Sequence, residues 1–459
     1  MNEKKTAGQE TALPLAGLRI VDISNVFSLP YATGLMADLG AEVIKIEGPA
    51  RPDTTRSGIS GVFPENEPGA DPWNRTSTYN LLNRGKKSVA LDLRRPEGRE
   101  VLKDLIRASD VLMENFTPRV MRGWELDYPN ATKLNARLIM VSCSGYGPQG
   151  PYAQYPAQAT TLEATHGLAH VTGYRGGVPS KAGQSFVDFL ATWALVMGTT
   201  LALRYRHRFG KGLWVDVGMY QLGCYMVAER ILDWEVNKRL GERIGNRHPW
   251  LAPQGCYRCA GDDQWCVVSV QDDEEWAALC RTIGRPELAQ DARFASNSAR
   301  MRNHDEIDRI IAAWTAGLSK TAAMERLQAA GVRAGAVFDA RDMHLDPHAK
   351  ARGLLETVQF PPERGMGKRA IIGRPWRLSK LPLSARGPAP TLGQHNREVL
   401  QDLLGYDDAR YAQLEQSGIL GTRPTQPRPV LRMSMEERVR QGRLAYWDPE
   451  YKERLGMQD

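Results

Sequence analysis

The chain has 459 residues, of which 42% are hydrophobic and 25% are charged, and its formal net charge is +7. This length and composition exclude a disulfide-dominated miniprotein, a disordered chain and a fibrous repeat, and they allow several domains with a large core. The basic residues are spread along the chain in short runs, which favours an anionic small molecule over a nucleic-acid partner.

Three features bear on location and metal binding. Residues 1–13 are polar and mixed in charge, unlike a secretory signal, so we expect a cytoplasmic protein with reduced cysteines. The longest apolar stretch, residues 189–203, is shorter than the roughly 20 residues that span a bilayer, which predicts a buried helix and no membrane association. Cys256 and Cys259 form a single CxxC pair, and this pattern predicts two neighbouring strands and no metal.

Strand and helix patterns alternate along the first part of the chain. Apolar runs of strand length cover residues 18–24, 41–47, 87–93, 110–116 and 137–144, and helical spacing covers 30–39 and begins again at 96. This alternation predicts parallel βαβ units, and therefore an α/β fold with a large Rossmann-like domain. The Gly-, Pro-, Asn- and Asp-rich segment 53–73 predicts a long loop, and loops of that length are often functional.

The pattern changes near residue 220 and predicts a smaller α+β domain. Helical segments are expected at 228–240, 273–283, 305–315 and 320–330, and a hairpin is expected around Cys256. Short strands follow within 360–380, then helices at 396–404 and 408–416. We therefore divide the chain into a large α/β domain (1–225), a small α+β domain (226–340), a return segment to the large domain (341–422), and a Pro-rich linker with a charged helical tail (423–459).

A glycine pattern follows one predicted strand. Gly145, Gly147 and Gly150 match the spacing GxGxxG of dinucleotide-binding turns. Pro148 and Pro151, however, remove backbone N–H groups where a pyrophosphate would need them. We do not expect a nicotinamide cofactor.

Asp188 is the strongest candidate for chemistry. It stands at the head of the apolar helix, where free N–H groups and the helix dipole favour a negative charge, and an apolar wall would leave its carboxylate poorly solvated and more nucleophilic. The alternative is structural, because Ser185 and Asp188 have the spacing of a capping box.

Two further motifs allow a functional and a structural interpretation. Asn115 and Phe116 end a predicted strand at the sheet edge where α/β folds bind ligands, although an ordinary strand end with a buried Phe fits the pattern equally well. His248 in the sequence GNRHP is either a base or a hydrogen-bonded turn residue.

The order of the segments resembles the class III CoA-transferase family, which includes formyl-CoA transferase, carnitine CoA-transferase and α-methylacyl-CoA racemase. The resemblance covers residues 15–420. It rests on LAGLRIVDIS, LMADLGAEVIKIEGP, NRGKKSVALDL, PEGREVL, DVLMENFTP, SGYGPQGPYA, GQSFVDF, GKGLWVDVGMYQ, GNRHP, ARGLLETV and LGQHN.

The resemblance implies transfer of CoA from an acyl-CoA donor to a carboxylic acid, with CoA as a substrate and no permanently bound cofactor. It implies that Asp188 is the nucleophile and forms first a mixed anhydride and then an aspartyl-CoA thioester. It also implies an interlocked homodimer.

Residues are carried over from the family by position. The resemblance implies CoA contacts from Val26, Ser28, Leu91, Asn115 and Phe116, and we add Arg51, Arg119 and Arg122 as candidates for phosphate contacts. The family arginine after the ENF motif is replaced here by Gly123, and Arg119 and Arg122 are the nearby substitutes.

Phe27, Gln158 and His248 are assigned to the substrate pocket. Racemase members carry a His–Asp pair at the position of Gln158 and Ala159, and Gln cannot accept a proton at neutral pH, which favours transfer over racemisation. Two alternatives remain. One is a racemase or isomerase that uses another base, such as His166 or His248; the other is a non-catalytic acyl-CoA-binding subunit.

Overall fold

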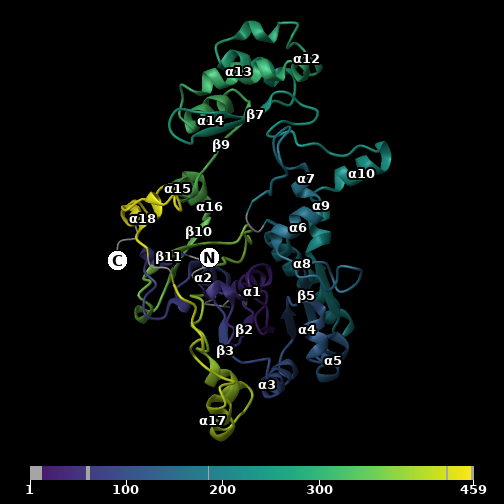
Figure 1. Ribbon diagram of the computed structural model, residues 1–459, viewed down its shortest axis with the longest axis vertical. Helices are drawn as coiled ribbons and strands as arrows, with labels where there is room; N and C mark the ends of the chain where they lie inside the picture. Colours follow the sequence, from purple (N-terminus) through teal and green to yellow (C-terminus); the bar gives the residue numbers. More distant parts are fainter. Residues whose placement is uncertain (1–12, 58–61, 184–185, 431–432, 456–459) are drawn as a thin grey trace, which may run out of the picture. The chain divides into compact units, whose positions relative to one another are not determined.

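The computed structural model describes residues 13–57, 62–183, 186–430 and 433–455 (Figure 1). The chain divides into two compact units. The first comprises residues 1–166, 183–226 and 347–459, and the second comprises 167–182 and 227–346.

The first unit is built on a parallel sheet that, within the described residues, has six strands in the order β3-β2-β1-β4-β5-β6. In this sheet Ile20 lies between Val43 and Val111. The direction of strand addition reverses between β1 and β4, and such a switch point opens a crevice at the carboxyl ends of the strands. The strands are β1 Arg19–Asp22, β2 Glu42–Glu47, β3 Lys87–Ala90, β4 Val111–Glu114, β5 Ile139–Ser144 and β6 Trp214–Gly218.

Helices cover both faces of this sheet, because alternate strand residues point to opposite sides. Val21, Ile44 and Leu112 belong to one core together with α3 (Pro96–Arg107), α5 (Tyr128–Leu134), η6 (Glu398–Leu403) and α17 (Asp408–Gln416). Ile20 and Val43 belong to the other, together with α1 (Ser28–Asp38) and α8 (Phe186–Phe209). The α/β fold predicted from the sequence is confirmed.

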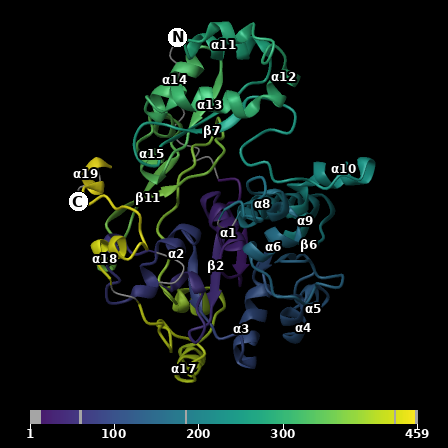
Figure 2. The ribbon, with the colours of Figure 1, turned by 45° about the horizontal axis from the view of Figure 1, so that its top comes forward.

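Short elements complete the first unit. Helix α8 packs against α6 (Ala159–Thr165), α9 (Met219–Tyr225), β5 and β6, and the three helices lie together in both views (Figures 1 and 2). The remaining elements are η1 Thr54–Arg56, η2 Pro64–Asn66, η3 Pro72–Asn74, α2 Ser77–Leu82, α4 Pro118–Gly123, α16 Pro347–Arg352, β10 Leu355–Gln359, η5 Pro362–Arg364, β11 Lys368–Ile372, α18 Met435–Arg440 and α19 Tyr451–Arg454.

The second unit is a small α+β body. Its antiparallel sheet has the order β7-β8-β9, and Trp276, Phe294 and Ile307 lie in its core. The predicted hairpin is confirmed, with Cys256 on β7 and Cys266 on β8. The elements are α7 Leu168–Val171, α10 Ala228–Asn237, β7 Gln254–Arg258, β8 Trp265–Ser269, α11 Asp273–Thr282, η4 Pro286–Ala289, α12 Asn297–Arg302, α13 His304–Thr315, α14 Lys320–Ala329, β9 Arg333–Ala336 and α15 Ala340–Leu345.

Two expectations differ from the structure. Helix α8 is longer than the predicted 189–203 and is not buried all round, since Met197 and Leu201 are exposed on one face while Leu195 lies in the core. By length and composition alone α8 is long and apolar enough to cross a membrane, which is also true of the core helices of some soluble proteins. Residues 167–182, predicted within the large domain, belong to the second unit because Arg243 and Gly245 bond to their backbone.

Candidate active site

A cavity of about 670 Å³ lies at the switch point of the parallel sheet. Its walls come from the segments that follow β1, β2 and β3 and from helix α4. The lining residues are Ile23, Asn25, Val26, Ile46, Glu47, Gly48, Arg51, Pro52, Thr54, Leu91, Asp92, Leu93, Arg94, Phe116, Arg119, Val120, Gly123 and Trp124. The lining thus combines apolar side chains with three arginines and two acidic residues, Glu47 and Asp92.

The structure brings five of the predicted site residues together at this cavity: Val26, Arg51, Leu91, Phe116 and Arg119. Two further residues were missed by sequence reasoning. Arg94 is paired with Asp92 and its side chain is 61% exposed, and Trp124 packs edge-on against Phe116 with ring centroids 5.3 Å apart. Arg94 could have been predicted as a site residue from its position shortly after the end of β3, where α/β sheets bind ligands.

Asn115 and Arg122 lie outside this lining. The Asn115 amide pairs with the backbone of Asn25, accepting its N–H at 2.8 Å and donating to its carbonyl oxygen at 2.7 Å. This pair joins the loops after β1 and β4, so Asn115 shapes the cavity through Asn25. Arg122 lines a separate cavity of about 180 Å³, together with Glu114 and Asp216.

This second cavity holds two carboxyl groups with unusual proton affinity. Burial raises the pKa of Glu114 to about 7, and the nearby Asp216 carboxylate acts in the same direction. Burial also raises the pKa of Asp216. Glu114 Oε2 accepts the backbone N–H of Phe116 at 2.8 Å, so this carboxyl supports a residue that lines the larger cavity.

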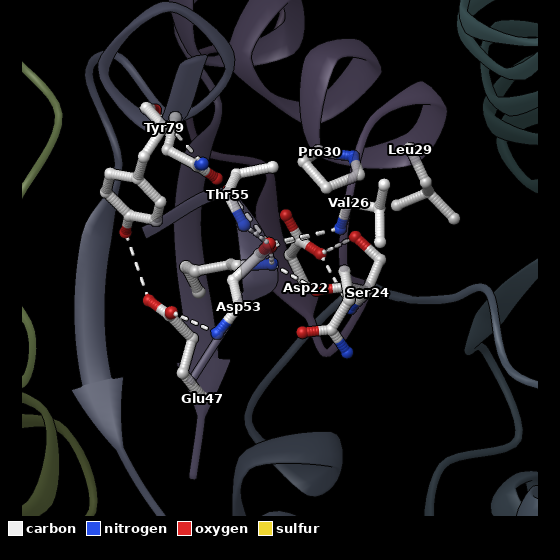
Figure 3. A network of polar contacts seen from close by, with 12 residues as sticks. Asp22, Ser24, Val26, Leu29, Pro30, Glu47, Asp53, Thr55 and Tyr79 are labelled. Carbon is white, nitrogen blue, oxygen red and sulfur yellow. Dashed lines mark hydrogen bonds and ion pairs between the residues drawn. The ribbon is translucent and has the colours of Figure 1, made fainter. Parts of the chain in front are cut away.

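The loop that follows β1 has an unusual backbone. Val26 has a φ of +73°, a left-handed conformation that costs a β-branched residue about 1–3 kcal/mol. The Asp53 carboxylate accepts the Val26 N–H at 3.1 and 3.3 Å (Figure 3). The left-handed conformation of Val26 is thus accompanied by a hydrogen bond to the buried Asp53 side chain.

A network of buried charges lies around Asp53. Its acidic members are Asp22, Glu47 and Asp53, and its basic members are Lys45, Arg56 and Lys86. Burial alone would raise the pKa of Asp22, but the ammonium groups of Lys86 and Lys45 outweigh it and hold this pKa well below its usual value. Burial lowers the pKa of Lys86 to about 8 despite its contact with Asp22. The opposing charges support a rigid base for the loops around the cavity.

Asp188 lies in the first turn of α8 and is half-buried. The Thr192 hydroxyl lies 2.9 Å from the Asp188 carbonyl oxygen and 2.9 Å from that of Ser28, which begins α1. The start of α8 is therefore attached to the start of α1. Ser185, the partner of Asp188 in the predicted capping box, lies outside the described residues.

A buried thiol, Cys143, and a cluster of aromatic rings lie near the start of α8. Burial raises the pKa of Cys143 to about 12, and the negative charge of Asp188 acts in the same direction. Phe27 contacts Phe189 edge-on, with ring centroids 5.0 Å apart and an interplanar angle of 73°. Tyr31 and Trp193 extend this aromatic cluster.

The last three predicted site residues are placed as follows. Ser28 is buried at the start of α1, with its hydroxyl 3.9 Å from Cys143 Sγ. Gln158 is exposed before α6, and its backbone N–H donates to Thr161. His248 belongs to the second unit, where its Nδ1 accepts the N–H of Trp250 at 3.2 Å.

The pattern of CoA-transferase family III matches residues 15–396. The chain is 34% identical over 415 residues to the succinyl-CoA–D-citramalate CoA-transferase of Chloroflexus aurantiacus, covering 90% of this chain and all of the relative. It is 29% identical over 415 residues to human succinyl-CoA:glutarate CoA-transferase, covering 90% of this chain and 91% of that one. A crystal structure of a CAIB/BAIF family protein from Brucella suis matches with a TM-score of 0.76 and 29% identity, covering 85% of this chain and all of that chain. The chain belongs to CoA-transferase family III, the enzymes that transfer CoA from an acyl-CoA to a carboxylic acid.

Proposed function

We propose that this chain transfers CoA through covalent intermediates on Asp188. The observation that carries the proposal is the short connection between the cavity and the start of α8. Val26 lines the cavity, and the next residue, Phe27, contacts Phe189. The Thr192 hydroxyl connects the backbone carbonyl of Ser28 with that of Asp188. A thioester that extends from the cavity past Val26 would approach the Asp188 carboxylate.

The reaction balances without an external oxidant, base or metal. A carboxylate oxygen of Asp188 attacks the donor thioester, the C–S bond breaks, and a mixed anhydride and CoA thiolate form. The thiolate then attacks the aspartyl carbonyl, which releases the donor acid and leaves an aspartyl-CoA thioester. The acceptor carboxylate attacks this thioester, and the thiolate it expels takes the acceptor acyl group and regenerates Asp188.

The site would make the Asp188 carboxylate a better nucleophile than a carboxylate in water. A carboxylate is a weak nucleophile, so position and partial desolvation must supply much of the acceleration. The rings of Phe27 and Tyr31 contact Phe189, the residue after Asp188, and would shield one side of its carboxylate from water once the substrate is bound. The N-terminus of α1 offers backbone N–H groups for developing negative charge, because its N-cap, Phe27, provides no side-chain acceptor for them.

We assign the binding of CoA to the larger cavity. Arg51, Arg94 and Arg119 would meet the phosphates, because arginine binds them with paired N–H donors. Phe116 and Trp124 would contact the adenine, while Val26 and Leu91 would flank the rest of the molecule.

The relatives suggest the substrates. Several are named for succinyl-CoA as donor, with D-citramalate, L-malate or glutarate as acceptors. We therefore propose succinyl-CoA as the donor and a dicarboxylic acid as the acceptor. We also propose a cytoplasmic homodimer, supported by the family resemblance and by the exposed apolar face of α8 at Met197 and Leu201.

The direct test replaces Asp188 with Ala. We expect CoA binding to persist, measured by calorimetry, while transfer from succinyl-CoA to a panel of dicarboxylic acids is lost. A variant with near wild-type turnover would contradict the proposal. Deuterium exchange at the α-carbon without any acceptor would instead indicate racemase or isomerase chemistry, and tight CoA binding without transfer by the wild type would indicate a binding subunit.

A further inference from the structure

The loop that follows β1 is held by other parts of the chain at nearly every position. Each contact comes from a different element or loop, so the loop has little freedom of its own. Lys45 donates to the Ser24 carbonyl, Asn115 pairs with Asn25, Asp53 accepts the Val26 N–H, and Thr192 binds the Ser28 carbonyl.

Among these contacts, the one from Asp53 acts where the backbone conformation is unfavourable. Val26 has a φ of +73°, which glycine adopts freely and valine does not. The Asp53 side chain is fully buried, and its carboxylate accepts the Val26 N–H at 3.1 and 3.3 Å (Figure 3). A hydrogen bond from a backbone N–H to a buried charged acceptor is among the stronger kinds in a protein.

Asp53 is itself held firmly. Its Oδ1 accepts the backbone N–H of Thr55 at 2.9 Å and the Thr55 hydroxyl at 2.8 Å, while Lys45 Nζ lies 3.4 Å from Oδ2. Its own backbone N–H donates to Glu47 at 3.1 Å. The carboxylate therefore has a single orientation, and its hydrogen bond fixes the direction of the Val26 N–H.

We propose that Asp53 is a positioning residue for CoA transfer. It stabilises the left-handed turn at Val26 and so places Phe27 and Ser28 next to the start of α8. The inference rests on the proposed function of Asp188. Asp53 is absent from the lining of the larger cavity and acts through Val26.

The same residue joins the two ends of the site. Arg51, which we assign to a phosphate, precedes Asp53 by two residues in the loop after β2. Asp53 reaches from this loop to Val26, which leads to the reacting end. Loss of Asp53 should therefore slow the chemical step more than it weakens CoA binding.

The test combines two substitutions. Asp53→Asn keeps the size of the side chain but gives the Val26 N–H a poorer acceptor. We expect kcat to fall about 10- to 100-fold, as for small misplacements of reacting groups, with a smaller change in the Kd of CoA. Val26→Gly alone removes a side chain that we place against CoA, so its own kcat and Kd serve as the reference for the double variant. In the Asp53→Asn background, Val26→Gly should recover most of the lost kcat, because glycine accepts the turn unaided.

A matched control separates positioning from general support of the fold. Asp38 is also a buried carboxylate, paired with Arg84 and Arg374 at 2.8 Å, and it lies at the far end of α1 from Val26. Asp38→Asn should lower the unfolding midpoint, and Val26→Gly should restore none of its lost activity.

The remaining outcomes are also decisive. If Asp53→Asn does not fold, Thr55→Val removes one hydrogen bond from Asp53 while keeping the charge, and it should give a smaller kcat loss that Val26→Gly rescues. Unchanged kcat in a folded Asp53→Asn protein, or no rescue by Val26→Gly, would overturn the proposal. A wild-type enzyme that neither binds CoA nor forms an adduct at Asp188 would instead refute the proposed function.

Discussion

The rings of Phe27 and Phe189 meet edge-on, with centroids 5.0 Å apart. The residue before Phe27 lines the cavity at the switch point, and the residue before Phe189 is the candidate nucleophile. One aromatic contact thus connects the loop that ends β1 with the helix that carries Asp188.

This contact should matter for turnover. Phe27→Ala and Phe189→Ala each remove it, and an aromatic pair contributes about 0.5–1.5 kcal/mol beyond its buried area. We expect each substitution to lower kcat and the double variant to lose less than the sum of the two. A double-mutant cycle on kcat measures this coupling, and strictly additive losses would show that the contact does not position Asp188.

The phosphate assignment predicts salt-sensitive losses of affinity. Arg51→Ala, Arg94→Ala and Arg119→Ala should each weaken CoA binding roughly 10- to 100-fold, as expected when a charge-assisted hydrogen bond of about 1.5–3 kcal/mol is lost. The control is Arg95→Ala, which removes an exposed arginine paired with Glu97. Calorimetry at low and moderate salt measures the effect, and equal affinities for all four variants would refute the assignment.

Glu114 should make stability depend on pH. Its pKa is raised by burial from 4.5 to about 7, so the folded state holds the proton more tightly than the unfolded chain. The stability linked to this proton is present below pH 4.5 and is lost as the pH rises through 7.

The matching variant is Glu114→Gln, which stays neutral at every pH. It should gain about 3 kcal/mol relative to wild type between pH 4.5 and pH 8, estimated from the linkage between pKa and stability. Denaturant unfolding at several pH values measures the gain. A difference that does not change with pH would contradict the raised pKa.

The C-terminal segment should support the loop that carries Arg51. The Thr425 N–H donates to the carbonyl of Pro49 at 3.0 Å, and Arg423 pairs with Asp71 at 3.3 Å. A chain that ends after Thr422 should therefore bind CoA more weakly. Lys452→Ala serves as the control, because it removes a partly exposed ion pair with Glu65 and leaves the contacts of Thr425 and Arg423 in place. Equal CoA affinity of the shortened and full chains would show that the segment does not support this loop.

The sequence predicted β1 to β5 well, because most residues of these strands are buried and each strand contains consecutive hydrophobic side chains. It did not predict β6, since Trp214–Gly218 carries Asp216 and lies at the edge of the sheet, with only Val217 buried. Residues 167–182 were assigned to the wrong unit, because the hydrogen bonds from Arg243 and Gly245 that hold them come from a distant part of the chain.

The candidate site could be predicted in part. Strand ends of a parallel sheet converge, so Val26, Leu91 and Phe116 were expected at one place. Which way a side chain turns there depends on tertiary partners, and this is why Asn115 pairs with the backbone of Asn25 and does not itself line the cavity. The role of Asp53 depends on a φ value and a buried network, and neither is visible in composition or spacing.

The most direct test of the account is intact-protein mass spectrometry after incubation with succinyl-CoA, followed by hydroxylamine trapping and peptide mapping. We predict a covalent adduct on the peptide that contains Asp188, present in wild type and absent in Asp188→Ala. An active wild-type enzyme that shows no adduct, or an adduct at another residue, would contradict Asp188 as the nucleophile.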